Sequence, residues 1–245
     1  MKIIIKLLEL LLFPFFLISF LFTFLFWDII LKLSPKKYLN TLVSLLNLCI
    51  KNCLRILGTK FEVLGAVPKL DKKSCIIVCN HQSMFDMPWL YSVFKEYSPR
   101  YVAKTELSKN IPAISVCLRK HKSALINRKN SHQALDEISN LSKRMNLENH
   151  AVIIFPEGTR ARDGKLKRFK LNGLKELIKT ESNKTTPLII PVAIDGTWKL
   201  NKNKFGPMPI FSKLRMKIGE TIEAKEINNI EKIIAGLLEE IRAKE

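Results

Sequence analysis

The sequence lacks the features that define a disulfide-bonded, zinc-binding or nucleotide-binding protein. Its five cysteines are too few and too irregularly placed for a disulfide framework. Cys49 and Cys53 are four residues apart, as are Cys75 and Cys79, but no histidine set of the zinc type lies near either pair. There is no Gly-x-Gly-x-x-Gly motif and no Walker loop. We therefore expect reduced, mostly buried thiols, a cytosolic folded part and no nucleotide-dependent chemistry.

Acidic residues are also scarce compared with basic ones. The 245 residues include 41 Lys and Arg against 22 Asp and Glu, a formal net charge of +19. Such a charge predicts an anionic partner: nucleic acid, a lipid surface or a phosphorylated metabolite. With 47% apolar residues the chain is too hydrophobic to be disordered. Its length indicates one domain with an appendage.

One long uncharged run lies near the amino terminus. It covers the eighteen residues from Leu10 to Trp27, mostly Leu and Phe, which is the lower bound for a helix that crosses a hydrocarbon core of about 30 Å. No small-residue cleavage site follows, and the first alanine is Ala66, so we do not expect a cleaved signal peptide. Pro14 and Glu9 favour a bent or shortened helix, which leaves a full crossing and a one-leaflet insertion as two open alternatives.

A second stretch, Tyr38 to Leu57, predicts an amphipathic helix at the membrane interface. Its apolar residues recur at helical spacing and its polar residues lie towards another side: Leu42, Leu45, Leu46, Cys49, Ile50 and Cys53 against Lys51, Asn52 and Arg55. Residues 34–37 form the turn, and their lysines suit anionic headgroups of the cytoplasmic leaflet. The two stretches predict a membrane-anchoring helical hairpin over residues 1–58. A core hairpin of a soluble domain is the alternative, but phenylalanines cover every face of the first helix.

Residues 59–245 predict one α/β domain. Short apolar runs typical of strands cover Phe61 to Leu64, Cys75 to Cys79, Tyr101 to Ala103, Ala124 to Asn127, Ala151 to Phe155, Leu188 to Ile194 and Leu214 to Ile218. Amphipathic helical patterns cover Leu135 to Met145 and Ile227 to Ile241. Because strands and helices alternate, we predict a mixed, largely parallel sheet flanked by helices.

The loop after the second predicted strand carries a histidine and a carboxylate. His81 and Asp86 are five residues apart, which on a continuous helix would separate them by roughly 140°. Pro88 favours a helix that starts near Asp86 and runs to about Tyr97, so the preceding residues are free to curl back. The carboxylate can then orient the imidazole as a general base without an enzymic nucleophile, which predicts transfer to a hydroxyl of the substrate. The alternative is that Asp86, alone or with Ser83, only caps the helix.

The loop after the fifth predicted strand, Phe155 to Arg160, combines an acid, a glycine, a hydroxyl and a guanidinium. Gly158 permits close backbone approach to a ligand, and Arg160 suits a bidentate grip on phosphate. A surface turn with an ion pair between Glu157 and Arg160 is the alternative. Two further basic residues, Lys104 and Arg128, lie at the ends of predicted strands, where a bound phosphate can reach them. The alternative is that each is a solvated surface charge.

Together these loops resemble the signature motifs of a known family. Asn80-His81-Gln82-Ser83-Met84-Phe85-Asp86, which has the HX4D form, and Phe155-Pro156-Glu157-Gly158-Thr159-Arg160 resemble those of the glycerolipid acyltransferases, particularly the 1-acyl-sn-glycerol-3-phosphate (lysophosphatidic acid) acyltransferases. A looser similarity covers Lys104-Thr105-Glu106-Leu107, Leu125-Ile126-Asn127-Arg128 and Ile190-Pro191-Val192-Ala193-Ile194. The chain departs from the family at Lys122, where glycine is common, and in Lys170-Leu171-Asn172-Gly173, which is one residue longer than the frequent Lys-x-Gly.

The resemblance implies an activity and roles for individual residues. His81 would be the general base and Asp86 its partner, while the acceptor's glycerol phosphate would be held by Arg128, Glu157, Gly158, Thr159 and Arg160, with Lys104 as a further candidate. The implied reaction moves an acyl chain from acyl-CoA or acyl carrier protein to the sn-2 hydroxyl of 1-acylglycerol 3-phosphate and gives phosphatidic acid. It needs no metal or redox cofactor, and the catalytic domain would lie on the cytoplasmic face of a membrane.

Other functions stay open on the sequence alone. Acylation of glycerol 3-phosphate or of another lysophospholipid would use the same residues. A non-catalytic lipid-binding protein would keep the helices and the basic surface. Nucleic-acid binding would explain the charge, but most phenylalanines lie in the apolar run and not among the basic residues, so stacking platforms are lacking and we expect no nucleic-acid partner.

Overall fold

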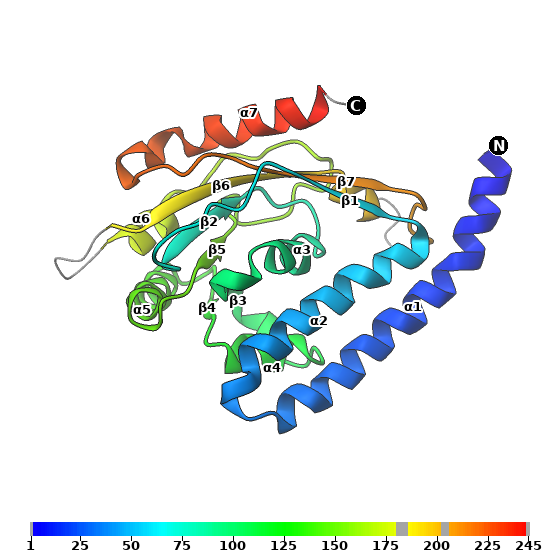
Figure 1. The fold of residues 1–245 in the computed structure, drawn as a ribbon, viewed down its shortest axis with the longest axis horizontal. Helices are drawn as coiled ribbons and strands as arrows, with labels where there is room; N and C mark the ends of the chain where they lie inside the picture. Colours follow the sequence, from blue (N-terminus) through cyan, green and yellow to red (C-terminus); the bar gives the residue numbers. More distant parts are fainter. Residues whose placement is uncertain (1, 180–185, 202–205, 244–245) are drawn as a thin grey trace.

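The computed structural model describes residues 2–179, 186–201 and 206–243 (Figure 1). The strands in these ranges are β1 (Lys60–Leu64), β2 (Cys75–Cys79), β3 (Arg100–Lys104), β4 (Ala124–Ile126), β5 (Val152–Ile154), β6 (Leu188–Asp195) and β7 (Lys213–Ile218). The α-helices are α1 (Lys2–Leu33), α2 (Leu39–Cys53), α3 (Asp86–Val93), α4 (Ile114–Lys120), α5 (Ser131–Glu148), α6 (Asn172–Ile178) and α7 (Ile230–Arg242). Each predicted strand is confirmed to within one residue at either end.

The strands form one sheet in the order β1-β7-β6-β2-β5-β3-β4. Neighbouring strands are parallel except β6 and β7, which pair antiparallel. This arrangement confirms the predicted mixed, largely parallel sheet. Because β2, β3, β4 and β5 run in the same direction, their carboxyl ends meet at one edge, where ligand sites of such sheets lie.

Helices cover both faces of the sheet, as the buried residues of β2 illustrate. Cys75, Ile77 and Cys79 face the cluster that contains α1 to α4. Ile76 and Val78 face the cluster that contains α5, α6 and α7. Figure 1 shows α7 on one side of the sheet and α1 to α4 on the other. The alternation follows from the two-residue period of a strand, so a fully apolar strand such as β2 must be buried on both faces.

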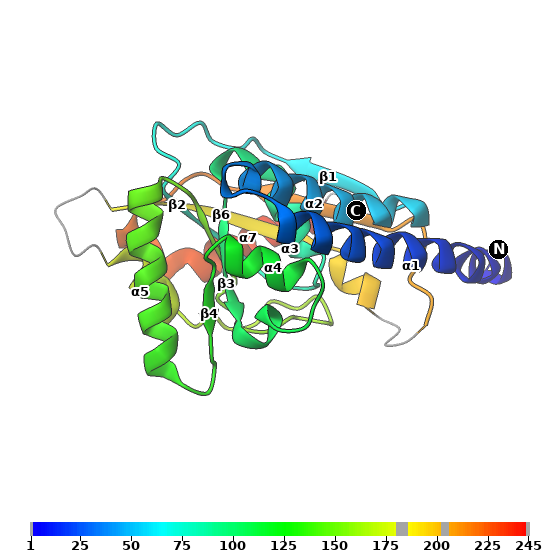
Figure 2. The same ribbon diagram turned by 90° about the horizontal axis from the view of Figure 1, so that it is seen from below.

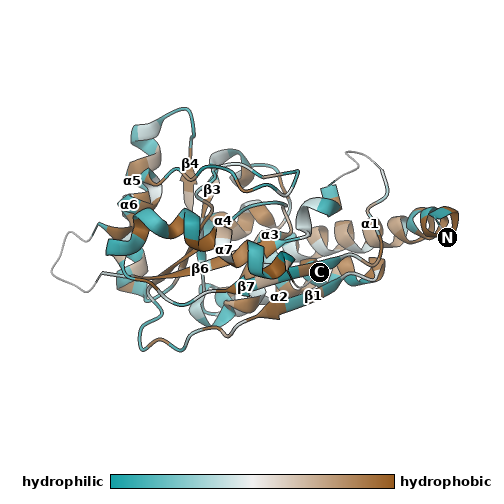
Figure 3. Ribbon diagram, turned by 90° about the horizontal axis from the view of Figure 1, so that it is seen from above, coloured by the Kyte–Doolittle hydropathy of each residue, from teal (hydrophilic) through white to brown (hydrophobic). Residues whose placement is uncertain are grey.

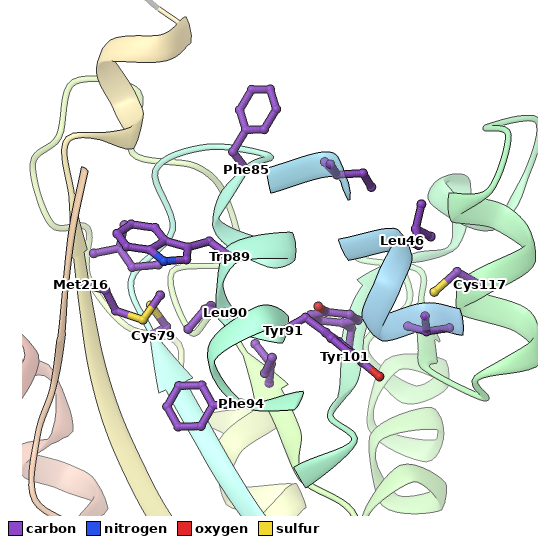
Figure 4. Packing of buried hydrophobic residues seen from close by; sticks show 14 of the residues in the cluster. Leu46, Cys79, Phe85, Trp89, Leu90, Tyr91, Phe94, Tyr101, Cys117 and Met216 are labelled. Atoms are coloured by element: carbon purple, nitrogen blue, oxygen red, sulfur yellow. The ribbon is translucent and has the colours of Figure 1, made fainter. Parts of the chain in front are cut away.

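Helix α3 lies between the sheet and α2 and carries the bulkiest part of the core (Figure 4). Trp89, Tyr91 and Phe94 are at most 1% exposed. The Trp89 ring packs edge-on against Phe61 of β1, 5.2 Å between centroids. The sequence predicted this helix to continue to about Tyr97, but α3 ends at Val93 and a short 3-10 turn covers Lys95–Tyr97.

Helices α1 and α2 run antiparallel side by side (Figures 1 and 2). Of the described residues, only those of α1 form a helix long and apolar enough to cross a membrane. Helix α2 instead buries Leu46, Ile50 and Cys53 within the same core cluster as α3. The predicted membrane-anchoring hairpin is therefore wrong in its second helix, because the apolar face of α2 packs on protein and not on lipid. The division of the chain at residue 58 stays a prediction.

Helix α1 has two apolar faces with different surroundings. One face, including Phe16, Trp27 and Leu31, packs on the rest of the protein. The opposite face is exposed along almost the whole helix: Ile3, Ile4, Leu7, Leu10, Leu11, Phe15, Ile18, Leu21, Phe22, Leu25, Ile29 and Leu33 are each more than half exposed. We call these twelve residues the α1 stripe; Figure 3 colours most of α1 as hydrophobic. Such a continuous apolar surface on a folded chain marks a contact site for protein or lipid.

Candidate active site

Two adjacent loops at the carboxyl edge of the sheet form the candidate site. The histidine loop is residues 80–85, between β2 and α3, and the glycine loop is residues 155–164, after β5. Since β2 and β5 pair in parallel, both loops leave the sheet in the same direction. The Ala161 N–H donates to the His81 carbonyl oxygen at 2.7 Å, which joins the two loops directly.

Asn80 fixes the start of the histidine loop. Its side-chain amide donates to the Ile194 carbonyl oxygen at 2.8 Å, and its Oδ1 accepts from the Ile194 N–H at 2.7 Å. The Asn80 side chain therefore bonds the backbone of β6 just beyond the end of β2, in place of the backbone groups that a longer β2 would supply. This contact sets where the next residue, His81, leaves the sheet.

His81 and Asp86 are in contact, as the curled-back loop predicts. His81 Nδ1 lies 2.9 Å from Asp86 Oδ2, with the imidazole 15% exposed and the carboxylate fully buried. The imidazole stacks on the Phe155 ring of the glycine loop, 4.2 Å between centroids. A Nδ1–H donor to the carboxylate leaves Nε2 with a lone pair, which is the protonation state of a base.

The buried Asp86 carboxylate has several further donors. Oδ2 accepts the backbone N–H of Gln82 at 2.6 Å and of Ser83 at 2.7 Å. Oδ1 accepts the Thr197 hydroxyl at 2.6 Å. Burial of a carboxylate is unfavourable unless hydrogen bonds replace its water, and these donors supply that replacement. Asp86 is also the first residue of α3. Its bond from the Ser83 N–H is one half of a capping box, so the carboxylate orients the imidazole and also holds the residues that lead into the helix.

Neither of the nearest hydroxyl and thiol groups is placed as an enzymic nucleophile. Burial raises the pKa of the Cys79 thiol well above its usual value, and the charges of Asp86 and Glu157 raise it further. The Ser83 hydroxyl accepts a hydrogen bond from Asn201 Nδ2 at 2.7 Å and is itself buried. This agrees with a base that acts on a hydroxyl of the substrate.

Glu157 is placed differently from the other residues of its motif. Its side chain points inward, with Oε1 accepting the His81 N–H at 2.7 Å and Oε2 accepting the Lys167 N–H at 3.1 Å. Burial raises its pKa, against the lowering effect of these two hydrogen bonds. Both oxygens thus hold backbone, and the residue is 2% exposed. Glu157 therefore bonds to the histidine loop and to Lys167 and does not line the α1 cavity, and its assignment to the substrate site stays a prediction.

Gly158 has a positive φ of 67°, which an L side chain rarely adopts. A Cβ atom at this position would meet only the end of the Lys170 side chain, at 3.9 Å. The next two residues reach outward: Thr159 is exposed and Arg160 half-buried. The turn therefore combines a bare backbone with a hydroxyl and a guanidinium, as expected for a phosphate site.

A cavity of about 590 Å³ connects the glycine loop to α1. Its lining includes Met84 and Phe85 of the histidine loop, Arg160 and Arg162 of the glycine loop, Phe13, Phe16, Leu17 and Phe20 of α1, and Leu200, Asn201, Gly206 and Met208. The ring of Phe85 lies 5.7 Å from that of Phe20. We call this space the α1 cavity; it has two guanidinium groups at one side and an apolar wall at the other.

Lys104 and Arg128 lie apart from this group. Both are exposed, at the carboxyl ends of β3 and β4, where Lys104 pairs in register with Ile126. They share the sheet edge with the two loops, and like His81 and Asp86 they do not line the α1 cavity. The structure thus brings together His81, Asp86, Glu157, Gly158 and Arg160, and leaves the two remaining basic residues on the neighbouring part of the edge.

Sequence reasoning missed several residues of the site. Arg162 lines the α1 cavity beside Arg160, and its position two residues further along the glycine loop is a signal that could have identified it. Thr197 and Asn201 bond to Asp86 and Ser83 from the 3-10 turn Thr197–Asn201. No local pattern marks these two residues, because their partners lie more than 100 positions earlier in the chain.

The fold and the paired loops define a class of protein. The Acyltransferase family matches residues 60–195, more than half of the chain, and this range contains both loops. The chain therefore belongs to the Acyltransferase family.

Individual relatives carry a more specific name. Human 1-acyl-sn-glycerol-3-phosphate acyltransferase beta is 37% identical over 113 residues, which cover 46% of this chain and 40% of that protein. The 1-acyl-sn-glycerol-3-phosphate acyltransferase of Cocos nucifera is 26% identical over 74% of this chain and 58% of its own length. The match thus spans about half the length of these relatives. The crystal structure of the 1-acyl-sn-glycerophosphate (LPA) acyltransferase PlsC from Thermotoga maritima aligns with a TM-score of 0.74 and 26% identity, covering 97% of this chain and 98% of that one.

Proposed function

We propose that this protein transfers an acyl chain from acyl-CoA or acyl carrier protein to the sn-2 hydroxyl of 1-acylglycerol 3-phosphate and produces phosphatidic acid. The observation that carries the proposal is the His81–Asp86 contact of 2.9 Å. Met84 and Phe85, which lie between these two residues in the chain, line a cavity together with two arginines and apolar residues of α1. An acceptor with a phosphate, a free hydroxyl and an acyl chain has the matching parts. The names of the relatives support the same acceptor.

In the proposed mechanism His81 is the general base. Its Nε2 takes the proton of the acceptor hydroxyl while the oxygen attacks the thioester carbonyl carbon and a C–O bond forms. Asp86 stabilises the imidazolium through Nδ1–H. The tetrahedral intermediate then expels the thiolate as the C–S bond breaks, and the imidazolium returns the proton to sulfur. Because a thioester is already activated, the step needs no further cofactor.

The acceptor phosphate is proposed to bind Arg160, assisted by Thr159 and the bare backbone at Gly158. The acceptor's acyl chain would follow the apolar wall of the α1 cavity, which favours a lysophospholipid over glycerol 3-phosphate. Lys104 and Arg128 are proposed to add positive charge along the same edge, which attracts an anionic headgroup. Glu157 would act indirectly, by holding the His81 backbone.

The α1 stripe is proposed to lie in one leaflet of a membrane. Buried contacts from Phe16 to Leu31 hold the opposite face of α1 on the protein. If α1 crossed a bilayer along the membrane normal, the domain packed against it would also have to enter the bilayer. A helix with lipid on one face and protein on the other lies in the interface plane. Lysines at the turn, Lys36 and Lys37, favour the cytoplasmic leaflet.

An acceptor panel tests the proposed reaction. Detergent-purified protein is mixed with either acyl donor and with 1-acylglycerol 3-phosphate, glycerol 3-phosphate or another lysophospholipid, and thiol release is measured. We expect the fastest release with 1-acylglycerol 3-phosphate. His81→Ala and Asp86→Asn should each lower kcat by roughly 10² to 10⁴.

Two outcomes would contradict the proposal. Near wild-type turnover by the His81→Ala variant would show that His81 is not the general base. Absence of thiol release with every acceptor, from protein that binds vesicles normally, indicates a non-catalytic lipid-binding protein. A matched control is His132→Ala, since His132 also contacts an aspartate, at 2.9 Å, but lies exposed on α5; its kcat should equal that of the wild type.

A further inference from the structure

The last residue of α7 contacts both the end of β6 and the glycine loop. The Arg242 guanidinium donates to Asp195 Oδ2 through Nε at 3.1 Å and to Asp195 Oδ1 through NH2 at 3.2 Å. The same NH2 group donates to the Gly164 carbonyl oxygen at 2.7 Å. One planar side chain therefore fixes the distance between the carboxyl end of β6 and the far end of the glycine loop.

Asp195 extends this connection to the histidine loop. Its Oδ1 accepts the side-chain amide of Gln82 at 3.0 Å, and both residues are buried. The backbone N–H of Gln82 donates in turn to Asp86 at 2.6 Å. Asp195 thus orients the side chain of Gln82, the residue that follows His81, while Asp86 binds the Gln82 main chain.

The contact lies outside the α1 cavity. A separate cavity of about 280 Å³ is lined by Asp163, Gly164, Lys165, Asp195, Trp198, Lys199 and Arg242. None of these residues is among those that line the α1 cavity. Arg242 and Asp195 are therefore placed to act on the reacting groups through the loops and not by touching the acceptor.

We propose that Arg242 and Asp195 are positioning residues for acyl transfer, which together set the spacing between the histidine loop and the glycine loop. The inference rests on the proposed function, because it concerns how His81 and Arg160 are placed relative to each other. Arg242 holds the loop that carries Arg160 through Gly164. Asp195 holds the loop that carries His81 through Gln82. Ala161 and Glu157 join the two loops at His81, so loss of the bridge should shift the Gly164 end of the glycine loop relative to Gln82 rather than separate the loops entirely.

The bridge is proposed to matter more for geometry than for stability. The Arg242 side chain is 44% exposed and that of Asp195 is 10% exposed; when Arg242 is removed, water can reach the space that it leaves, and Gln82 still donates to Asp195. Displacement of reacting groups by about 1 Å, in contrast, lowers turnover by about 10²-fold. Substitution of Arg242 should therefore leave the protein folded and still impair catalysis.

The test compares Arg242→Ala, Arg242→Lys and Asp195→Asn with a matched control, Glu240→Gln. Glu240 forms an ion pair with Lys217 of β7, so the control breaks another contact between α7 and the sheet, two residues earlier, without touching either loop. kcat, the acceptor KM and the melting temperature are measured for each purified full-length variant, together with His81→Ala.

We expect Arg242→Ala to lower kcat by roughly 10- to 100-fold and to raise the acceptor KM several-fold, because both loops lose a support. Asp195→Asn should mainly lower kcat, since it weakens the bridge but keeps an acceptor for Gln82. Arg242→Lys keeps a charge for Asp195 but not the planar fork, so it should recover part of the loss. Glu240→Gln should match the wild type in kcat and KM.

The outcomes separate this inference from the proposed function. If His81→Ala is inactive and Arg242→Ala is as active as the wild type, the positioning role is wrong and the proposed reaction stands. Equal losses in Arg242→Ala and Glu240→Gln also overturn it, because they indicate general loosening of α7. If His81→Ala keeps its activity, the proposed function itself fails.

Discussion

Glu157 and Arg160 lie three residues apart in the glycine loop but point in different directions. The Glu157 carboxylate is buried and holds the backbone N–H groups of His81 and Lys167. Arg160 lines the α1 cavity. At the residue scale, the proposed function would separate support of the base from binding of the acceptor, although the two residues belong to one short motif.

The first prediction follows from that separation. Glu157→Gln retains one acceptor oxygen but places an amide NH₂ opposite either the His81 N–H or the Lys167 N–H, so the hold of this side chain on the histidine loop is weakened. We expect kcat to fall by roughly 10-fold or more with little change in the acceptor KM. Arg160→Ala should instead raise the acceptor KM by roughly 10-fold or more, because a charge-assisted contact with phosphate is lost. Steady-state kinetics with varied acceptor distinguishes the two patterns, and a pure KM effect in Glu157→Gln would refute its supporting role.

The sequence was sufficient to predict the contact between His81 and Asp86, because both lie on one short loop whose bend follows from Pro88. It was not sufficient to predict Thr197, which donates to Asp86 across 111 positions. Nor does anything local to Glu157 indicate that its side chain points inward. Such contacts depend on which strands are neighbours in the sheet, and periodicity carries no information on strand order.

At the element scale, the carboxyl end of α1 is held by polar contacts. The Lys120 ammonium donates to the carbonyl oxygens of Leu31, Lys32 and Ser34 at 2.5, 2.9 and 3.2 Å. Asp28 accepts the Ala113 N–H at 2.8 Å. A cation at this end satisfies carbonyl groups that lack partners within the helix and interacts favourably with the helix dipole.

The second prediction concerns this helix end. Lys120→Met removes the cap but keeps much of the side-chain volume, so the free energy of unfolding should fall by about 1 kcal/mol. Urea unfolding in detergent, followed by tryptophan fluorescence, measures the change. Lys129→Met is the control, because Lys129 is exposed in the loop before α5. Equal stability of the Lys120→Met variant and the wild type would show that the cap does not hold α1.

The strands and α2 show what the sequence can and cannot predict about elements. Apolar runs bounded by turn residues located all seven strands, since burial on both faces leaves a continuous apolar segment. The amphipathic pattern of α2 located its helix but not the partner of its apolar face. Leu46 and Ile50 are equally compatible with a lipid and a protein environment. Their environment is therefore set by the position of α3 in the fold, which the sequence pattern does not give.

At the scale of the whole molecule, two buried histidines connect stability to pH. Burial lowers the pKa of His121 well below its usual value, and the nearby Arg100 guanidinium lowers it further. Burial lowers the pKa of His150 to about 4 from 6.5, opposed by its hydrogen bond to the Ala151 carbonyl. As pH falls from about 6.5 to 4, the unfolded chain takes up protons that the folded chain does not, so stability decreases.

The third prediction follows from this sign. Titration of His150 alone should lower the free energy of unfolding by about 2 kcal/mol between pH 7 and pH 5. His150→Gln keeps a donor for the Ala151 carbonyl but does not titrate, so its free energy of unfolding should depend less on pH. Unfolding curves at pH 7, 6 and 5 give the slopes. His132→Gln, at an exposed position, should have the wild-type slope; parallel curves for the His150→Gln variant and the wild type would exclude this linkage.

The fourth prediction tests the α1 stripe. Ile18 and Phe22 are 66% and 65% exposed, so Ile18→Asp with Phe22→Asp should leave the fold intact. Replacing two apolar contacts by charges should weaken binding to anionic vesicles by at least about tenfold. Flotation with vesicles measures the bound fraction. A double change at exposed positions away from α1, Lys72→Gln with Lys129→Gln, lowers the net charge by the same two units and is the control; equal binding of the two variants would mean that α1 does not contact lipid.

The two sides of α1 have a consequence for how the rate must be measured. The helix is only about 10 Å across, and its inner residues Phe13, Phe16 and Phe20 line the α1 cavity while the stripe faces outward. Under the proposed function, an acceptor that enters from the leaflet would pass around a single helix and would not need to dissolve in water. Turnover should follow the mole fraction of acceptor in the surface. Diluting that surface with inert detergent, at constant bulk concentration, should slow the enzyme.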